Sequence, residues 1–282
     1  MHVLVAGCGW LGRAAAQALL ARGDQVTGVR RDPGRAEALR ALGITPLTLD
    51  LADPEAARAL PDDVEAVLAL QSSSADDPQA YARVYLDTGA NLLREAARRG
   101  WKALVWTGST GVLGQRDGAW ADENAPAAPA TPGAEVLART ERLYLDAAKA
   151  GAPARVLRLS GLYGPGRTWM LERVRSGALA LGPGDGAWLN SCHLDDAVAA
   201  LLAVLDRGRD GALYHATDAE PLRRADVVRL AAGLLGIPAP AAPERAPAGG
   251  PDRRVSGEWT RKQLGLRLRW PSLREGLPPL LG

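Results

Sequence analysis

Three glycines near the start of the chain have the spacing of a turn that holds phosphate groups. Gly7, Gly9 and Gly12 follow a short apolar run and precede a stretch rich in Ala and Leu that is typical of a helix. Strand, glycine turn and helix form the context that a dinucleotide-binding fingerprint requires. Gly7 permits the tight turn, Gly9 leaves room for a pyrophosphate, and Gly12 allows close packing of helix on strand. The N-terminus of this helix would supply N–H groups to the phosphates, and Trp10 and Leu11, between the glycines, are further predicted cofactor contacts.

Two arginines follow the second apolar run, where the ribose of a dinucleotide is recognised. An Asp or Glu at this place would bind the ribose 2′-OH, whereas an arginine accommodates a 2′-phosphate. Here Val29 is followed by Arg30 and Arg31, and the first acidic residue after Val29 is Asp32. The planar fork of arginine binds two phosphate oxygens. The sequence therefore predicts NADP in preference to NAD, with Arg30 as the main contact; solvated arginines in a surface loop are the alternative.

Two hydroxyl groups in the first half of the chain could handle a proton. Ser109 follows the fifth apolar run, where a hydroxyl can donate to a carbonyl or hydroxyl of a substrate. Without a base beside it, Ser109 would orient and polarise the substrate but would not ionise; the alternative is a turn serine that bonds to the backbone. Tyr85 could act as a proton-relay group, although a tyrosine on a helix that faces a sheet is more often part of the core.

Two residues further along are candidates for contact with the substrate. His193 has an intrinsic pKa suited to acid–base work, and the alternative is a buried histidine bonded to Asp195 or Asp196. Arg167 could contact an anionic substrate such as a nucleotide-sugar diphosphate, and the alternative is a loop arginine that caps a helix.

The elements that must position these residues alternate short apolar runs with helical patterns, which predicts βαβ units and a parallel sheet. The predicted strands are 3–6, 25–29, 45–49, 64–70, 103–107 and 155–159, and the predicted helices are 13–22, 33–42, 54–60, 79–99 and 133–150. Right-handed crossovers place ligands at the carboxyl ends of such strands. The fold class is therefore predicted as α/β, a Rossmann-type doubly wound parallel sheet with a small C-terminal α/β lobe on the substrate side.

The predicted domain organisation follows a change of pattern after residue 159. Residues 1–165 form the NAD(P)-binding domain, and 190–217 return to it. Residues 166–189 and 218–282 form the smaller lobe. Within that lobe, residues 237–252 are rich in Pro, Ala and Gly, which predicts an exposed loop or lid.

Composition and charge exclude several classes of protein. The 282 residues are 47% hydrophobic and 23% charged, which is ordinary for a globular protein, and a net charge of +2 is too small to indicate nucleic acid or an anionic membrane. Cys8 and Cys192 have no metal-site spacing and suggest no disulfide framework. No signal peptide and no run of about eighteen apolar residues is present. We expect a cytoplasmic protein without a metal site.

Five segments, in order along the chain, match the motifs of one known group. They are GANLLREAA (89–97), TGSTGVLG (107–114), RLSGLYGPGR (158–167), CHLDDAV (192–198) and the ending 265–277. They resemble the extended short-chain dehydrogenase/reductase family of sugar-nucleotide epimerases and dehydratases. The resemblance implies that Ser109 occupies the position of the catalytic serine and that Tyr163, a further candidate phenol, packs near the nicotinamide. A homodimer is common in this family.

The resemblance also implies positions for further cofactor contacts. Asp50 and Leu51 resemble the pair that meets the adenine, with Asp50 accepting from its exocyclic amine; the alternative for Asp50 is a helix cap before Pro54. The other expected contacts lie at the ends of the fourth and fifth strands: Leu70, Gln71, Ser72 and Thr107.

The departures from the family pattern concern its catalytic set of Asn, Ser, Tyr and Lys. In an alignment through Glu141, the Tyr position falls on Gly133 and the Lys position on Leu137, and neither residue can transfer a proton. The Asn position falls on Tyr85, so that only Ser109 remains. This pattern resembles the atypical, YeeZ-like subgroup, which keeps the cofactor fingerprint and loses the catalytic pair.

The sequence as a whole predicts an NADP-dependent oxidoreductase or epimerase-like enzyme that acts on a small molecule, with sugar-derived compounds among the candidates. The alternative is a non-catalytic NADP-binding protein that senses redox state or serves as a scaffold. The missing Tyr and Lys favour the alternative, and the retained Ser109 opposes it.

Overall fold

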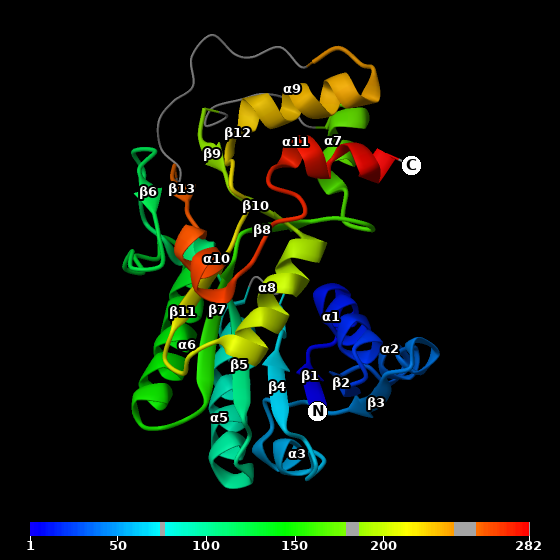
Figure 1. The fold of residues 1–282 in the computed structure, drawn as a ribbon, viewed down its shortest axis with the longest axis vertical. Coiled ribbons are helices and arrows are strands. Elements are labelled where there is room, and N and C mark those ends of the chain that lie inside the picture. The colour runs from blue at the N-terminus through cyan, green and yellow to red at the C-terminus, as the bar shows by residue number, and fades with distance from the viewer. Residues whose placement is uncertain (74–76, 179–185, 240–251, 282) are drawn as a thin grey trace. The chain divides into compact units, whose positions relative to one another are not determined.

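The main sheet carries the predicted Rossmann-type order. The computed structural model describes residues 1–73, 77–178, 186–239 and 252–281. Seven strands lie in the order β11-β7-β5-β4-β1-β2-β3 (Figure 1), and the pairs around β1, β2 and β4 are parallel. Their bounds are β1 His2–Ala6, β2 Gln25–Arg30, β3 Thr45–Thr48, β4 Ala66–Ala69, β5 Ala103–Ser109, β7 Ala154–Leu159 and β11 Leu213–Ala216. The predicted fold class is confirmed.

The helices that connect these strands begin at strong local signals. They are α1 Trp10–Ala21, α2 Pro33–Glu37, α3 Pro54–Arg58, α4 Pro78–Ala82, α5 Thr88–Arg99, α6 Pro132–Lys149 and α8 Leu194–Arg207. Four of them start with a proline that follows a capping Asp or Thr, whose side chain accepts from a backbone N–H of the first turn. The predicted helix 79–99 is divided, because the π-helical turn Arg83–Asp87 joins α4 to α5.

Four further α-helices and three two-stranded ladders follow among the described residues. The helices are α7 Trp169–Arg175, α9 Arg224–Leu235, α10 Glu258–Leu264 and α11 Leu273–Gly276. The two-stranded ladders pair β8 Gly161–Tyr163 with β10 Ser191–His193, β9 Trp188–Leu189 with β12 Leu222–Arg223, and β6 Trp120–Ala121 with β13 Arg254–Val255.

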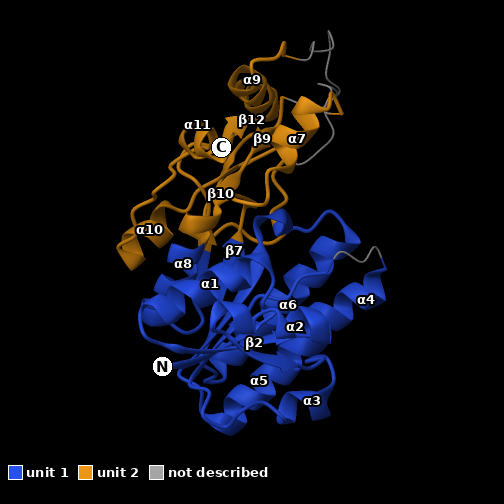
Figure 2. Ribbon diagram, turned by 90° about the vertical axis from the view of Figure 1, so that its right-hand side faces the viewer, with its two compact units in different colours: residues 1–112, 128–158, 198–214 blue, residues 113–127, 159–197, 215–282 orange. Residues whose placement is uncertain are grey.

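The chain forms two compact units, coloured separately in Figure 2. Unit 1 comprises 1–112, 128–158 and 198–214, and unit 2 comprises 113–127, 159–197 and 215–282. Residues 113–127 thus group with the C-terminal unit, since β6 forms a parallel ladder with β13, whereas the sequence placed them in the cofactor domain. Most of the predicted loop at 237–252 lies outside the described residues.

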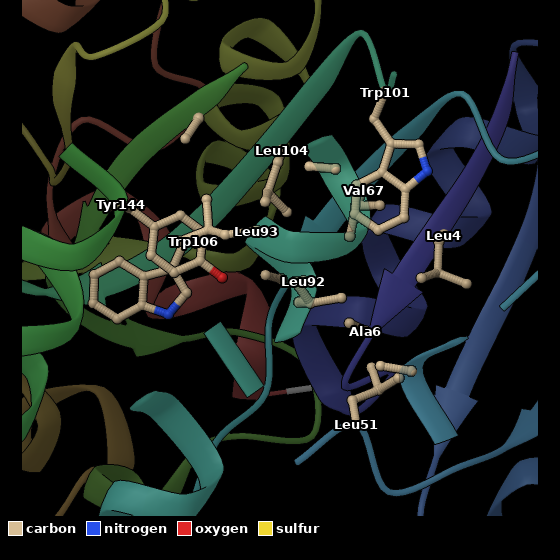
Figure 3. Packing of buried hydrophobic residues seen from close by; sticks show 14 of the residues in the cluster. Leu4, Ala6, Leu51, Val67, Leu92, Leu93, Trp101, Leu104, Trp106 and Tyr144 are labelled. Atoms are coloured by element: carbon tan, nitrogen blue, oxygen red, sulfur yellow. The ribbon is translucent and has the colours of Figure 1, made fainter. Parts of the chain in front are cut away.

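One buried cluster of unit 1 lies between the sheet and helices α5 and α6. Leu4 and Ala6 of β1 join Leu92 of α5 in one buried cluster. In the same cluster Trp106 of β5 stacks on Tyr144 of α6, with ring centroids 5.5 Å apart and planes 18° apart (Figure 3). Because the chain contains no Phe, Trp and Tyr supply the aromatic packing that holds α6 against β5.

A buried ion pair fixes the same helix to the next strand. Arg158 of β7 donates from Nε and Nη2 to the two carboxylate oxygens of Glu141 in α6, each at 2.7 Å. Both side chains are nearly fully buried. A buried pair of this kind contributes little net stability, but the loss of one partner leaves an uncompensated charge in the interior.

Replacement of Glu141 by Gln should therefore destabilise the protein strongly. We expect Glu141→Gln to lower the free energy of unfolding by about 3–5 kcal/mol, measured by denaturant titration. Asp146→Asn, on the same helix, removes an exposed pair with Lys149 and should leave the unfolding curve unchanged. Equal effects of the two substitutions would show that the loss of the Glu141 charge leaves no costly uncompensated charge at Arg158.

Candidate functional site

The glycine turn after β1 is closed by the chain that follows β4. Gly7 has a φ of +83°, and a Cβ on it would lie 2.5 Å from the backbone N and Cα of Gln71. At Gly12 of α1, a Cβ would lie 2.9 Å from the Gly7 carbonyl oxygen and 3.1 Å from a methyl group of Val5. Both positions therefore exclude a side chain. The local geometry is that of the predicted fingerprint, with helix packed directly on strand.

The N-terminus of α1 carries no competing anion. Gly9 is its N-cap, no side chain caps it, and its first turn contains no acidic residue. Helix N-termini present backbone N–H groups and the positive end of the helix dipole. The N-terminus of helix α1 is therefore suited to bind a phosphate.

The guanidinium of Arg30 lies over the glycine turn. Its Nη1 is 3.1 Å from the place of a Cβ on Gly9. Asp32, the nearest acidic residue in sequence, accepts the backbone N–H of Arg35 at 2.7 Å and caps α2. Arg31 is exposed. The end of β2 thus presents positive charge next to the turn, which suits a 2′-phosphate better than a bare ribose.

Burial raises the pKa of the Cys8 thiol to about 11, although Arg30 and Arg13 act in the opposite direction. This cysteine lies inside the glycine turn and is almost fully buried. It remains a protonated thiol at neutral pH.

Asp50 is engaged by an arginine and does not cap the following helix. Its Oδ2 accepts from Nη2 of Arg83 at 2.7 Å, and its Oδ1 accepts the N–H of Ala52 at 3.1 Å. Burial alone would raise the pKa of Asp50, but these bonds outweigh it and hold the pKa below its ordinary value. Helix α3 is capped by Asp53, so the helix-cap alternative for Asp50 is wrong. An adenine contact of Asp50 stays a prediction.

An amide at the carboxyl end of β4 has no hydrogen-bond partner among the described residues. Both Nε2 and Oε1 of Gln71 are buried without a hydrogen bond, directly behind Gly7. Unpartnered buried polar groups are costly, so Gln71 indicates a polar ligand at this edge. The glycine turn, Arg30 and Gln71 together fit a dinucleotide cofactor.

The other predicted cofactor residues occupy the same edge of the sheet in different environments. Leu70 is buried and its N–H donates to the Ala6 carbonyl at 2.7 Å. Ser72 is exposed. Thr107 is buried and donates to the Ala69 carbonyl at 3.4 Å. Leu51 is buried, and its carbonyl accepts from Asn91 at 2.9 Å. Such residues can contact a cofactor by backbone groups, and their cofactor roles stay predictions.

Ser109 ends β5 with its hydroxyl oxygen bound to the turn. Its Oγ accepts the N–H of Gly111 at 3.0 Å, which is the contact of the turn-serine alternative. A hydroxyl that accepts one bond still has its own proton to donate. Ser109 is partly exposed, so it can be a turn residue and a substrate-polarising group at once.

Two tyrosines, one of which the sequence analysis missed, lie together beside the start of α6. The ring centroids of Tyr81 and Tyr85 are 4.7 Å apart. Tyr85 is buried, and its hydroxyl oxygen accepts the N–H of Ser73 at 3.2 Å. A Cβ on Gly133 would lie 3.7 Å from Cε1 and Cζ of Tyr81. The available signal was the four-residue spacing of the tyrosines, which places them on one side of a helix.

Tyr163 and His193 belong to unit 2 and pack edge to face, with centroids 5.1 Å apart. The Tyr163 hydroxyl donates to the Ser272 carbonyl at 3.3 Å, and burial raises its pKa. Nδ1 of His193 accepts the backbone N–H of Asp195 at 3.1 Å. Burial lowers the pKa of His193 more than Asp195 and Asp196 raise it, so the ring is neutral. These contacts are those of packed residues; catalytic or substrate roles stay predictions.

The acidic pair behind His193 holds the C-terminal segment of unit 2. The two carboxylate oxygens of Asp196 accept the backbone N–H groups of Arg269 and Trp270 at 2.7 and 2.9 Å. Asp195 accepts from the Trp270 indole at 3.0 Å. Arg167 is exposed on the loop before α7, and its contact with substrate stays a prediction.

A second buried acid in unit 2 was not expected from the sequence. Both carboxylate oxygens of Asp218 are buried without a hydrogen bond, while its N–H donates to the Ser191 carbonyl at 2.7 Å. Burial raises the pKa of Asp218 well above its ordinary value, although the charge of Arg261 acts in the opposite direction. The sequence signal was weak, because one Asp after a strand also fits a turn.

The described ranges contain neither a candidate metal cluster nor a membrane-spanning helix. No group of three or more His, Cys, Asp and Glu residues in those ranges could hold a metal ion. No helix in the same part of the chain is long and apolar enough to cross a membrane.

Known proteins match this chain over most of its length. The family described as "NAD dependent epimerase/dehydratase family" matches residues 3–217. A Streptomyces "3-diazoavenalumate denitrifying reductase" is 33% identical over 85% of this chain and 83% of its own. "Protein YeeZ" of Escherichia coli K12 is 29% identical over 95% and 96%. A solved structure of a functionally unknown conserved protein from Silicibacter pomeroyi has a TM-score of 0.80 at 30% identity, over 99% and 97%.

Substitution of Asp218 should change how stability depends on pH. The pKa of Asp218 is raised in the folded state above its ordinary value of 3.8. The contribution of the protonated carboxyl to stability is therefore fully present below pH 3.8 and is lost as the pH rises through the folded-state pKa. We expect Asp218→Asn to unfold at least about 2 °C higher than wild type at about pH 8, and at the same temperature at about pH 4. Thermal unfolding measures both.

The exposed Asp226 of α9, paired with Arg229, provides the control for this prediction. Asp226→Asn should leave the dependence of the melting temperature on pH unchanged. A lower melting temperature for Asp218→Asn at about pH 8 would mean that the Asp218 carboxylate is ionised and stabilising.

Proposed function

Because the chain belongs to the NAD-dependent epimerase/dehydratase family, we propose that it is an NADP-dependent reductase of a small molecule that bears a carbonyl group. Family membership by itself implies an NAD(P)-dependent oxidoreductase. The observation that carries the finer proposal is the position of the Arg30 guanidinium over Gly9. The name of the Streptomyces relative, a reductase, supports reduction as the reaction class.

The residues of unit 1 have separate tasks in cofactor binding. The turn Gly7–Gly12 and the N-terminus of α1 would hold the pyrophosphate. Arg30 would pair with a 2′-phosphate, since a guanidinium forms two parallel bonds to phosphate oxygens. The unpartnered amide of Gln71 would bond to the polar part of the cofactor nearest the turn. When bound, a reduced nicotinamide would supply a hydride.

Ser109 would act on the oxygen of the substrate. Its Oγ is fixed by the Gly111 N–H, which leaves the hydroxyl proton to donate to a carbonyl oxygen. Such a donor stabilises the negative charge that develops when the carbonyl carbon is reduced. Hydroxyl donors suit an oxygen acceptor, which is why we favour a carbonyl substrate. Sugar-derived carbonyl compounds remain within this class.

The second candidate function is a non-catalytic NADP-binding protein. It is favoured by Gly133 and Leu137, which stand where the family has its proton-transferring pair. Both functions need the cofactor site, so only turnover separates them. If the protein binds NADPH but does not oxidise it in the presence of any carbonyl probe, the result would support a sensor or scaffold.

Reversal of the charge at Arg30 should remove the preference for NADPH. We expect Arg30→Glu to weaken NADPH binding at least about tenfold, because a charge-assisted bond is lost, and to leave NADH binding less affected. Tryptophan quenching and energy transfer to the nicotinamide measure both affinities. Arg35→Glu, an exposed change in α2, is the matched control. An unchanged NADPH-to-NADH ratio in Arg30→Glu would sink the assignment.

Removal of the Ser109 hydroxyl should reduce turnover without loss of cofactor. We expect Ser109→Ala to lower kcat for NADPH oxidation by about 100- to 1,000-fold, with NADPH affinity unchanged. The probes are phenanthrenequinone, diacetyl and ethyl acetoacetate. Ser176→Ala, at an exposed position after α7, should keep full activity. Full activity in Ser109→Ala would remove Ser109 from the mechanism.

A further inference from the structure

We propose that Tyr81 is the proton donor of this site and that Tyr85 is the residue that positions it. The inference rests on the proposed reductase function, because a proton donor is needed only where a substrate oxygen gains negative charge. It assigns a catalytic role to a residue that lies on α4, whereas the family places its tyrosine on the helix that corresponds to α6.

The first observation is the contact between Tyr81 and Gly133. A Cβ on Gly133 would meet Cε1 and Cζ of the Tyr81 ring at 3.7 Å and its hydroxyl oxygen at 4.0 Å. These are ordinary contact distances, so the phenol lies against the surface of α6 where a side chain from position 133 would leave the helix. The helix that lost its own tyrosine is therefore covered at that point by the phenol of another helix.

The second observation is the order of hydrogen bonds through Tyr85. The Ser73 N–H donates to the Tyr85 hydroxyl oxygen at 3.2 Å, and this leaves the Tyr85 proton for another acceptor. Burial raises the pKa of Tyr85, and its hydrogen bond with the Tyr81 hydroxyl raises it further. A bond that favours the protonated form is one in which Tyr85 donates. With the rings 4.7 Å apart, we assign Tyr85 as the donor to Tyr81, which would leave the Tyr81 proton for a substrate oxygen.

The third observation is how firmly the pair is held at the carboxyl edge of the sheet. Tyr85 lies in the π-helical turn Arg83–Asp87, a kind of distortion that is frequent at functional sites. Arg83 of the same turn is tied to Asp50, just after β3, at 2.7 Å. Ser73 follows β4. The segments that follow β3 and β4, two strands of the same sheet, thus hold the tyrosines at the edge where ligands of such sheets bind.

The fourth observation connects the pair to Ser109. The short turn Thr110–Val112 follows Ser109 directly. The carbonyl of Val112 accepts the N–H of Ala128 at 2.8 Å, four residues before α6 begins. The end of β5 and the start of α6 are therefore held together. Ser109 ends β5, and Tyr81 of α4 lies against Gly133 at the start of α6, so this link joins the segments that carry the two hydroxyl groups.

The proposed step balances with one hydride and one proton. The carbonyl carbon gains a hydride with its electron pair from the reduced nicotinamide, and the carbonyl π electrons move to the oxygen. The O–H bond of Tyr81 breaks and its proton passes to that oxygen. Water then returns a proton to the Tyr81 phenolate, which is only partly buried. Tyr85 keeps its proton throughout and orients Tyr81 by its hydrogen bond.

Three isosteric substitutions test the assignment in the full-length protein. We expect Tyr81→Phe to lower kcat about 100-fold or more with KM and NADPH affinity unchanged, using the carbonyl probes above. Tyr85→Phe should lower kcat about tenfold, also without a change in KM. Tyr144→Phe is the matched control, because its hydroxyl is fully buried and has no hydrogen-bond partner within the described ranges; it should keep full kcat.

A measurement without cofactor or substrate tests the pair itself. The chain contains five tyrosines, so fluorotyrosine labelling gives a fluorine NMR spectrum that single Tyr→Phe variants can assign. Tyr85→Phe keeps the ring and removes the hydroxyl, so it should shift the Tyr81 resonance. Tyr144→Phe should leave that resonance in place. A Tyr81 resonance that does not respond to Tyr85→Phe would overturn the hydrogen-bonded pair.

The outcomes for this inference and for the proposed function are separable. Wild-type turnover with full kcat in Tyr81→Phe would overturn the inference alone. Binding of NADPH without turnover of any probe by the wild type would overturn the reductase function, and this inference with it. Loss of both turnover and NADPH affinity in Tyr81→Phe would show that the tyrosine maintains the fold of the cofactor site, which also contradicts a proton-donor role.

Discussion

The close approach of Gly7 to the backbone of Gln71 is the constraint on which the functional part of the structure depends. With 2.5 Å between a Gly7 Cβ and that backbone, the ends of β1 and β4 can meet only if position 7 has no side chain and accepts a positive φ. The turn then directs Gly9 towards Arg30 and starts α1. One steric requirement thus sets the shape of the glycine turn, the approach of the arginine and the burial of the Gln71 amide.

A large part of the fold could be predicted because its signals are local. The strands follow apolar runs, and the helices start where Asp or Thr precedes a proline, so neighbouring residues determine both. The position of Arg30 was also predictable, since it ends a strand beside the glycine turn. The contact of Tyr81 with Gly133 was not, because it joins residues about fifty positions apart on two helices. Asp218 was missed for the same reason: its burial depends on distant segments.

The chain keeps the local geometry of its family's cofactor site, whereas the sequence resemblance indicates a change in the catalytic set. The elements that favour a nucleotide, namely the turn, the uncapped helix and the arginine, are all retained in unit 1. The residues available for proton transfer are expected to differ, because the sequence resemblance places Gly133 and Leu137 of α6 at the family's Tyr and Lys positions. Phenols are nevertheless present at that edge, on α4 and the π-helical turn. Loss of a motif from one helix is therefore weak evidence for loss of chemistry when a neighbouring helix can supply the same group.

The buried thiol of Cys8 has a consequence for oxidative conditions. Thiolates react with peroxides and alkylating agents far faster than thiols do. With its pKa raised to about 11, Cys8 exists almost entirely as the unreactive thiol at cellular pH. A cysteine within the glycine turn could have made that turn an oxidation target. Burial instead keeps the thiol protonated, so that Cys8 is a poor target for oxidants although it lies at the centre of the turn.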